Sequence, residues 1–233
     1  MKQILVFIFS LSLVTANAQT HAYISSSGEM IFSFAKIKSA GADKSSDLRW
    51  SPVFNGQSLL NIDMTQHFGF FGGLAYRNVG FIYEPTSDTL KKFRTYNLGI
   101  PIGIKIGNMK GTFLFGGYEF EIPFAYKEKT FVNDSKKTVE TAWFSPKVNP
   151  YTQSLFAGIN FKGGMSVKFK YYLDNFFNAG YTENVGGVNI KPYANFTANV
   201  FYISLSWNAF KDIKSYETKK IRFKKKSAVE TAL

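Results

Sequence analysis

Two histidines, His21 and His67, are the only imidazole side chains in this 233-residue chain, and the chain has no cysteine. A metal centre built from histidine and cysteine is therefore excluded, because such centres need several of these ligands together. A lipid-modifying enzyme would need a histidine beside a serine nucleophile and a carboxylate. We find no such set, since GMSVKFK has no nucleophile elbow and Ser166 within it has the place of an inward strand residue. We expect no catalytic residue, metal or cofactor, and an enzyme that depends on His67 or His21 is kept as an alternative.

Paired carboxylates offer a second possible chemistry. Glu119 and Glu121 are two residues apart, as an acid and a base for glycoside cleavage could be. Strand periodicity, however, places several lysines on the same face, so we favour salt bridges for both carboxylates.

Buried charges are costly unless they are paired, and four acids against five bases predict an ion-pair network in a barrel interior. Eight strands leave little free lumen, so we favour a plug over a gated or narrow polar pore. The predicted network consists of Asp63, Arg77, Lys105, Glu119, Glu121, Lys162, Lys168, Lys170 and Asp174.

The first 18 residues have the pattern of a secretory signal: Lys2, an apolar run from Ile4 to Val14, and the small-residue site Ala16-Asn17-Ala18. An N-terminal anchor helix is the weaker alternative, because about 20 apolar residues are needed to span a bilayer. Export argues against nucleic acid as the partner of a chain with a formal charge of +12. Anionic lipid headgroups or an acidic envelope protein are the favoured counter-charges, and a simple solubility effect is the alternative.

The elements that must position these residues are strands. The sequence has 25 Phe and 19 Gly and, after the signal, no apolar run of membrane-helix length, which favours an all-β fold. Tight connections near 66–67, 107–110 and 162–164 alternate with long polar loops at 39–55, 84–92, 128–150 and 176–191. This alternation is typical of an outer-membrane barrel with both termini in the periplasm. The eight predicted strands lie near 28–38, 56–66, 68–83, 93–107, 111–127, 151–162, 164–175 and 192–210.

The stretch NLGIPIGIKIG, residues 97–107, alternates bulky hydrocarbon with Asn, Gly, Pro and Lys. A soluble barrel of the lipocalin type would turn the hydrocarbon inward around a ligand. A water-facing strand surface, however, disfavours Gly and Pro, whereas small residues suit a crowded interior. We therefore expect the hydrocarbon to face lipid and the small residues to face the interior of an eight-stranded, antiparallel, up-and-down transmembrane β-barrel.

Two finer expectations concern the phase of a strand, that is, which of its residues face lipid and which face the interior. The even positions of 113–126 are apolar or aromatic, which places Tyr126 on the lipid face. In the strand from Phe68 to Tyr83 the phase becomes ambiguous beyond Gly72-Gly73, where a bulge would account for it. The interfacial aromatic girdles are predicted to contain Tyr96, Tyr126 and Tyr151 at the loop end and Phe161, Trp207 and Phe210 at the turn end.

The stretches YNLGIPIGIKIG, GTFLFGGYEFEIPF and FAGINFKGGMSVKFKYYLDNFFN, with the signal and the chain length, resemble the PorT-like outer-membrane β-barrel family over most of residues 20–210. The resemblance implies a small eight-stranded barrel, and for some members a role in secretion machinery of the envelope. The chain departs from a common barrel pattern, because 23 residues follow the aromatic Phe210.

Residues 211–233 form a predicted basic periplasmic tail with eight Lys or Arg and three acids. A solvated terminus without a role is as plausible as an acidic periplasmic partner bound through Lys219, Lys220, Arg222, Lys224, Lys225 and Lys226. Together these features of the sequence predict a noncatalytic integral outer-membrane barrel at 19–210 with a structural or protein-interaction role in envelope assembly or secretion. A small-solute channel and a lipid-modifying enzyme are the alternatives.

Overall fold

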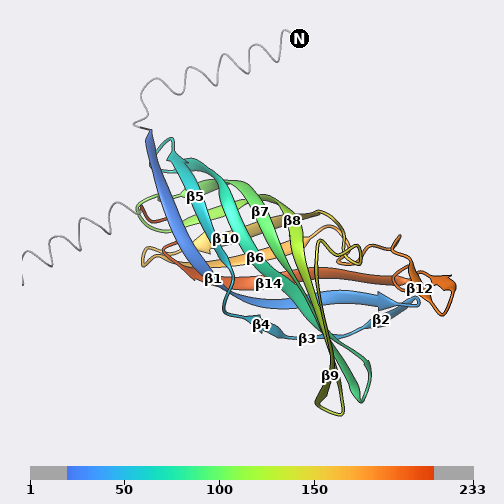
Figure 1. Ribbon diagram of the computed structural model, residues 1–233. Coiled ribbons are helices and arrows are strands. Elements are labelled where there is room, and N and C mark those ends of the chain that lie inside the picture. Colours follow the sequence, from blue (N-terminus) through green and yellow to red (C-terminus); the bar gives the residue numbers. More distant parts are fainter. Residues whose placement is uncertain (1–19, 213–233) are drawn as a thin grey trace, which may run out of the picture.

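Figure 1 shows a barrel of long antiparallel strands, and the computed structural model describes residues 20–212. Those residues contain no helix that is long and apolar enough to cross a membrane. The barrel wall consists of β1 (His21–Ser39), β5 (Gly56–Asp63), β6 (Phe68–Thr86), β7 (Thr89–Gly107), β8 (Phe113–Val132), β10 (Thr152–Asn160), β11 (Met165–Tyr172) and β14 (Phe196–Trp207).

Each wall strand pairs with the wall strands before and after it, and β14 pairs with β1 to close the ring. β8 pairs directly with β10, where Glu121 lies opposite Thr152. Closure of this kind leaves no unpaired edge along the ring. The predicted all-β, eight-stranded, antiparallel up-and-down barrel is confirmed, and each predicted strand overlaps one wall strand. The predicted signal peptide and residues 213–233 of the predicted tail lie outside the described residues.

The segment 39–55, predicted as a polar loop, forms part of the wall. β5 is short, and it pairs with β1 only up to Gly28. Beyond that point β2 (Ala42–Lys44) and β4 (Arg49–Ser51) pair with β1, and β3 (Ser46–Asp47) pairs with β6. The loop therefore turns back to bond the strand edges that β5 leaves open.

Two other predicted loops contain strands. β9 (Ser135–Trp143) continues the β6–β7–β8 sheet beyond the barrel, and β12 (Glu183–Val185) forms a hairpin with β13 (Val188–Ile190). Figure 1 shows β9 and the β6–β7 hairpin projecting from one end of the barrel. The tight turns lie at the other end, where β1 begins and β14 ends.

A bulge in β8 reverses the predicted orientation of Tyr126. Tyr96 lies opposite Ala125, whereas the next residue, Asn97, lies opposite Pro123, so β8 has one extra residue here. A bulge of one residue shifts the side-chain alternation of everything beyond it. Tyr126 is therefore fully buried inside the barrel, and the prediction that it belongs to the outward aromatic girdle is wrong.

The ladder between β6 and β7 runs without a bulge through the Gly-Gly pair of β6. Gly72 lies opposite Ile102 and Ala75 opposite Gly99, which is one register, and the shift occurs only beyond Tyr83. The ambiguous phase of this strand has another cause: residues 77–81 are all buried, and the outward-facing Asn78 is bonded by Arg49 and Asn55. A strand buried on both faces loses its polar alternation.

The barrel interior has three layers. An aromatic layer at the tight-turn end contains Leu59, Phe71, Phe113, Phe115, Phe156, Ala209 and Phe210. A larger apolar layer near the projecting hairpins includes Ile31, Phe81, Phe93, Tyr126, Phe177 and Tyr202. Charged side chains lie between the two.

Phe210, expected in the outward girdle, instead fills the interior against Phe71, Phe113 and Phe115, because the chain folds back under the barrel after Trp207.

Small residues on the inward face of β7 make room for large neighbours, as the pattern of residues 97–107 predicts. A Cβ at Gly99 would collide with the carboxylate of Glu119, and a Cβ at Gly103 would lie 2.5 Å from the ring of Phe71. In contrast, Leu98, Ile100 and Ile102 are more than half exposed on the outer face.

Candidate functional site

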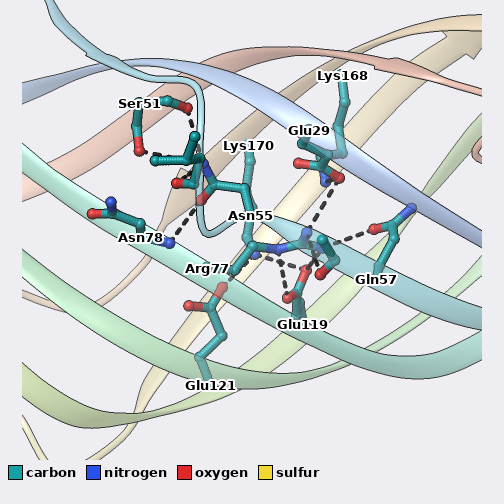
Figure 2. Close-up of polar contacts among 12 residues, drawn as sticks. Glu29, Ser51, Asn55, Gln57, Arg77, Asn78, Glu119, Glu121, Lys168 and Lys170 are labelled. Carbon is teal, nitrogen blue, oxygen red and sulfur yellow. Dashed lines mark hydrogen bonds and ion pairs between the residues drawn. The ribbon is translucent and has the colours of Figure 1, made fainter.

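The middle layer of the interior is a continuous set of six charged side chains (Figure 2). We call this set the interior ion-pair network; its members come from β1, β6, β8 and β11. Three carboxylates face three cations, so the formal charge of the network is zero. The members are Glu29, Arg77, Glu119, Glu121, Lys168 and Lys170.

Arg77 is the centre of one half of the network. Its Nε and Nη2 donate to the two carboxylate oxygens of Glu119 at 3.1 and 3.2 Å. Its Nη1 lies 3.3 Å from Glu29 Oε1, and Nη2 also donates to Gln57 Oε1 at 2.8 Å. Lys168 Nζ lies 2.7 Å from the same Glu29 oxygen. Bidentate contacts of this kind are among the strongest hydrogen bonds in proteins.

Lys170 joins the other half. Its Nζ lies 2.8 Å from Glu119 Oε2 and also contacts Glu121 Oε1. Tyr172 donates its hydroxyl to Glu121 Oε1 at 2.7 Å, and Asn97 donates its amide to Glu121 Oε2 at 2.6 Å. Both carboxylates are thus held by cations and hydrogen-bond donors, which supports structural pairing over acid–base work.

Local sequence places these groups. Residues two apart on a strand share a face, so EFE in β8 and KFK in β11 each direct two charges inward. β10 separates the two strands and has the small Ser154 at this level, whose hydroxyl donates to the carbonyl of Glu119 at 3.1 Å. The small residue leaves space for the lysines of β11 to reach the carboxylates of β8.

A second pair lies at the tight-turn end. Lys105 Nζ lies 2.5 Å from Asp63 Oδ1 and donates to Asn61 Oδ1 at 3.1 Å and to the Tyr23 hydroxyl at 3.2 Å. It also lies over the ring of Phe210, 5.7 Å from its centroid. This pair is separate from the interior ion-pair network.

Asp63 and Lys105 were predicted as members of the network and instead form this separate pair. Two further predicted members, Lys162 and Asp174, form no ion pair among the described residues. Lys162 is exposed in the tight turn after β10, which ends at Asn160. Asp174 follows the end of β11 and accepts a hydrogen bond from the backbone N–H of Gln153 at 2.6 Å. Lys162 lies in the turn, where the two-residue alternation of a strand no longer applies. Asp174 lines a small interior cavity with Thr152 and Tyr172, but its carboxylate is used by the Gln153 backbone.

Glu29 is the member that the sequence reasoning missed. It lies in the predicted strand 28–38 and has the same phase as Ile31 and Ser33, which are both buried. The two-residue alternation that places the charges of β8 and β11 inside the barrel also places Glu29 inside. With Glu29 the network has three carboxylates and three cations and is neutral, whereas without it one cation would be in excess.

The network is sealed within the barrel. Aromatic side chains cover it at both ends, and two cavities beside it have volumes of about 10 Å³ each. A cavity of that size holds about one water molecule. The paired charges and the aromatic rings above and below them thus occupy the interior at this level.

The two histidines lie away from this interior. His21 is exposed at the start of β1, and His67 is exposed in the β5–β6 turn, where its backbone N–H donates to Thr65 Oγ1 at 3.1 Å. Within residues 20–212, no group of three or more metal-ligating side chains is close enough to hold a metal ion.

The chain was compared with known proteins. No family model matches it, and no curated protein matches it either. Among solved structures, Ail of Yersinia pestis, in complex with the heparin analogue sucrose octasulfate, matches with 10% identity and a TM-score of 0.36, covering 79% of this chain and 98% of Ail. Neisserial surface protein A matches with 9% identity and a TM-score of 0.38, covering 81% of this chain and 98% of that one. Similarity this low carries no information on ligands or activity, and the fold assignment rests on the strand pairings described above.

Proposed function

We propose that this chain is a noncatalytic integral protein of the bacterial outer membrane, with a structural or protein-interaction role. The observation that carries the proposal is the outer surface of the barrel. Large apolar side chains cover it on successive strands while the charges are inside. Members of this belt with about half or more of their surface exposed include Ile24, Leu60, Leu74, Leu98, Ile100, Ile102, Ile106, Leu114, Leu155, Phe169 and Ile203.

An apolar surface this continuous is rare on a water-soluble monomer and is expected in lipid. Ring closure supports the same conclusion, because every backbone group inside a bilayer needs a partner within the protein. A soluble ligand-binding barrel is disfavoured, since its apolar face would line a cavity, whereas this interior is filled by ions and aromatic rings.

A channel is the second candidate that the polar interior raises. The six charges of the interior ion-pair network are paired with one another and covered at both ends, which disfavours a conducting path. We therefore favour a plugged barrel that presents its projecting hairpins to other molecules.

A finer role follows from the resemblance to the PorT-like family, which implies contact with envelope secretion or assembly components. We extend the proposal to that role, with the basic residues 219–226 as the contact for an acidic periplasmic protein. That segment lies outside the described residues, and deleting residues 213–233 is its test: loss of a co-purifying protein is expected. If every co-purifying protein remains, the tail has no such role.

The membrane assignment is tested by fractionation and electrophoresis. We expect the protein to need detergent for extraction from outer membranes and to shift in gel mobility on heating. Recovery in the aqueous fraction without detergent would contradict the assignment. Purified protein in planar bilayers should show no steady conductance, and large currents would instead identify a channel.

A further inference from the structure

Four basic residues face one another in pairs where β7 and β8 project beyond the barrel. Lys92 lies directly opposite Lys129, and Arg94 directly opposite Lys127. Like charges directly opposite across a strand pair are destabilising. Two such pairs in succession therefore lower the stability of the hairpin sheet unless something neutralises them.

Acids of β8 and of the neighbouring β9 form ion pairs on the other face of the sheet. Glu128 pairs with Lys91 at 3.0 Å, and Glu140 of β9 pairs with Lys147 at 2.7 Å. Because side chains alternate along a strand, these acids face away from Lys127 and Lys129. On the opposite face, none of Lys92, Arg94, Lys127 and Lys129 is within ion-pair distance of a carboxylate among the described residues. Asp47, which lies opposite Ile82, is on this same face without reaching them.

Arg49 of β4 is a further cation beside this face, but it lies opposite the inward-facing Ser33 and is not part of the exposed surface. It is only 7% exposed, and it donates to the carbonyl of Asn78 at 3.1 Å and to the side-chain oxygen of the same residue. A buried cation without a carboxylate is costly. Within residues 20–212, none of the five cations is within ion-pair distance of a carboxylate, although the exposed Asp47 and Glu84 lie on neighbouring strands. We call the four cations of β7 and β8 the basic outer face; they are Lys92, Arg94, Lys127 and Lys129.

The cations affect one another. Partial burial, then the positive charges of Arg94 and Lys127, holds the pKa of Lys129 below its ordinary value. An anion bound among them would remove this mutual repulsion.

An aromatic girdle lies directly below the basic outer face on the same side of the sheet. Tyr96 lies two residues after Arg94 and directly before Asn97. Its ring packs edge-on against Phe54, with ring centroids 6.0 Å apart. Trp143, opposite Ala125, stacks on Phe124 at 5.9 Å and is 72% exposed. Aromatic girdles lie at the level of lipid headgroups, so side chains one step further out along the strands lie at the depth of their phosphates.

We propose that the basic outer face binds phosphate groups of lipid headgroups in the membrane leaflet at the end of the projecting hairpins. The proposal rests on the membrane location proposed above. Lipid is favoured over a soluble polyanion because the four cations continue the girdle on the lipid-facing side of the sheet, where a bilayer would present its phosphates.

The test compares two charge-matched double variants of the full chain. Lys127→Gln/Lys129→Gln removes two cations from the basic outer face, and Lys110→Gln/Lys162→Gln removes two exposed lysines at the opposite end. Each is placed in nanodiscs of phosphatidylcholine with a minor fraction of diphosphorylated lipid A, and the lipid A that stays bound after transfer to detergent is measured by native mass spectrometry. A basic residue near a lipid surface contributes roughly fivefold to binding, so we expect the first variant to retain about 25-fold less and the second to match the unaltered chain.

The heat-dependent gel shift is recorded for every sample, which separates the two proposals. If both variants show the gel shift and retain equal amounts of lipid A, the basic outer face is not a phosphate site, whereas the barrel assignment stands. A chain that does not insert overturns the membrane location itself. If a soluble sulfated glycan binds the detergent-solubilised protein in a Lys127- and Lys129-dependent way while lipid A does not, the ligand is not lipid and the proposal fails.

Discussion

Arg77 of β6 and Glu119 of β8 meet in the barrel interior through two hydrogen bonds of 3.1 and 3.2 Å, and neither side chain is exposed. β7 lies between these strands, and the pair passes over the space that Gly99 leaves open. The contact therefore couples strands that do not pair with each other. It depends on a third residue whose only contribution is the absence of a side chain.

Replacing Glu119 by Ala removes the shared partner of two cations. Arg77 and Lys170 would then be buried with part of their charge unpaired, which costs about 3–5 kcal/mol of unfolding free energy for a buried pair. Urea unfolding of the barrel in detergent or lipid, followed by gel mobility or tryptophan fluorescence, measures the loss. Glu84→Ala, at an exposed site, is the control. Equal unfolding midpoints for the two variants would show that the network contributes little.

Replacing Gly99 by Ala puts a methyl group into the space of the Glu119 carboxylate. We expect a loss of about 1–3 kcal/mol, as for other overpacked interiors. In a Glu119→Ala background the same change should cost much less, because the colliding group is gone. The double-mutant cycle, again by urea unfolding, gives the coupling between the two sites. A cost that is the same in both backgrounds would contradict the proposed collision.

Phe210→Ala should weaken the barrel at its tight-turn end. The ring packs against Phe71, Phe113 and Phe115, and removal of a buried Phe costs about 3–5 kcal/mol. Trp207→Ala, on the outer face, serves as the comparison and should cost less in lipid. We expect no conductance from Phe210→Ala in planar bilayers, because the interior ion-pair network remains. Steady currents would show instead that the aromatic layer alone closes the lumen.

Spin labels can test both the outer surface and the bulge, since the chain has no native cysteine. Labels attached at Ile102 and Phe124 should relax with lipid-soluble oxygen, whereas one at Tyr126 should be immobile and shielded, although it is two residues from Phe124. The measurement is power-saturation electron paramagnetic resonance in bilayers. A lipid-exposed label at position 126 would mean that the alternation continues unbroken through β8. Water contact at position 102 would mean that the outer surface is not in lipid.

Much of the barrel could be predicted from residue patterns alone. Strand number, order and the inward face of residues 97–107 follow from alternation, because lipid or water on one side and a packed interior on the other impose a period of two. The same reasoning identified Arg77, Glu119, Glu121, Lys168 and Lys170 as inward charges. The reasoning failed for Lys162, because the last residue of a strand depends on turn geometry. It also failed for Asp174, whose carboxylate accepts a backbone hydrogen bond instead of pairing with a cation.

Other features depended on contacts between segments that are distant in the chain. The bulge that turns Tyr126 inward arises where Asn97 faces Pro123, and the fold of the chain beneath the barrel decides that Phe210 packs inside. The position of the 39–55 segment follows from the short length of β5, which leaves the edges of β1 and β6 to be bonded. Alternation along one strand determined which residues face inward, because it needs only local geometry. Which of those residues meet was decided by the closure of eight strands into one ring, because the partners lie on strands that are distant in the chain.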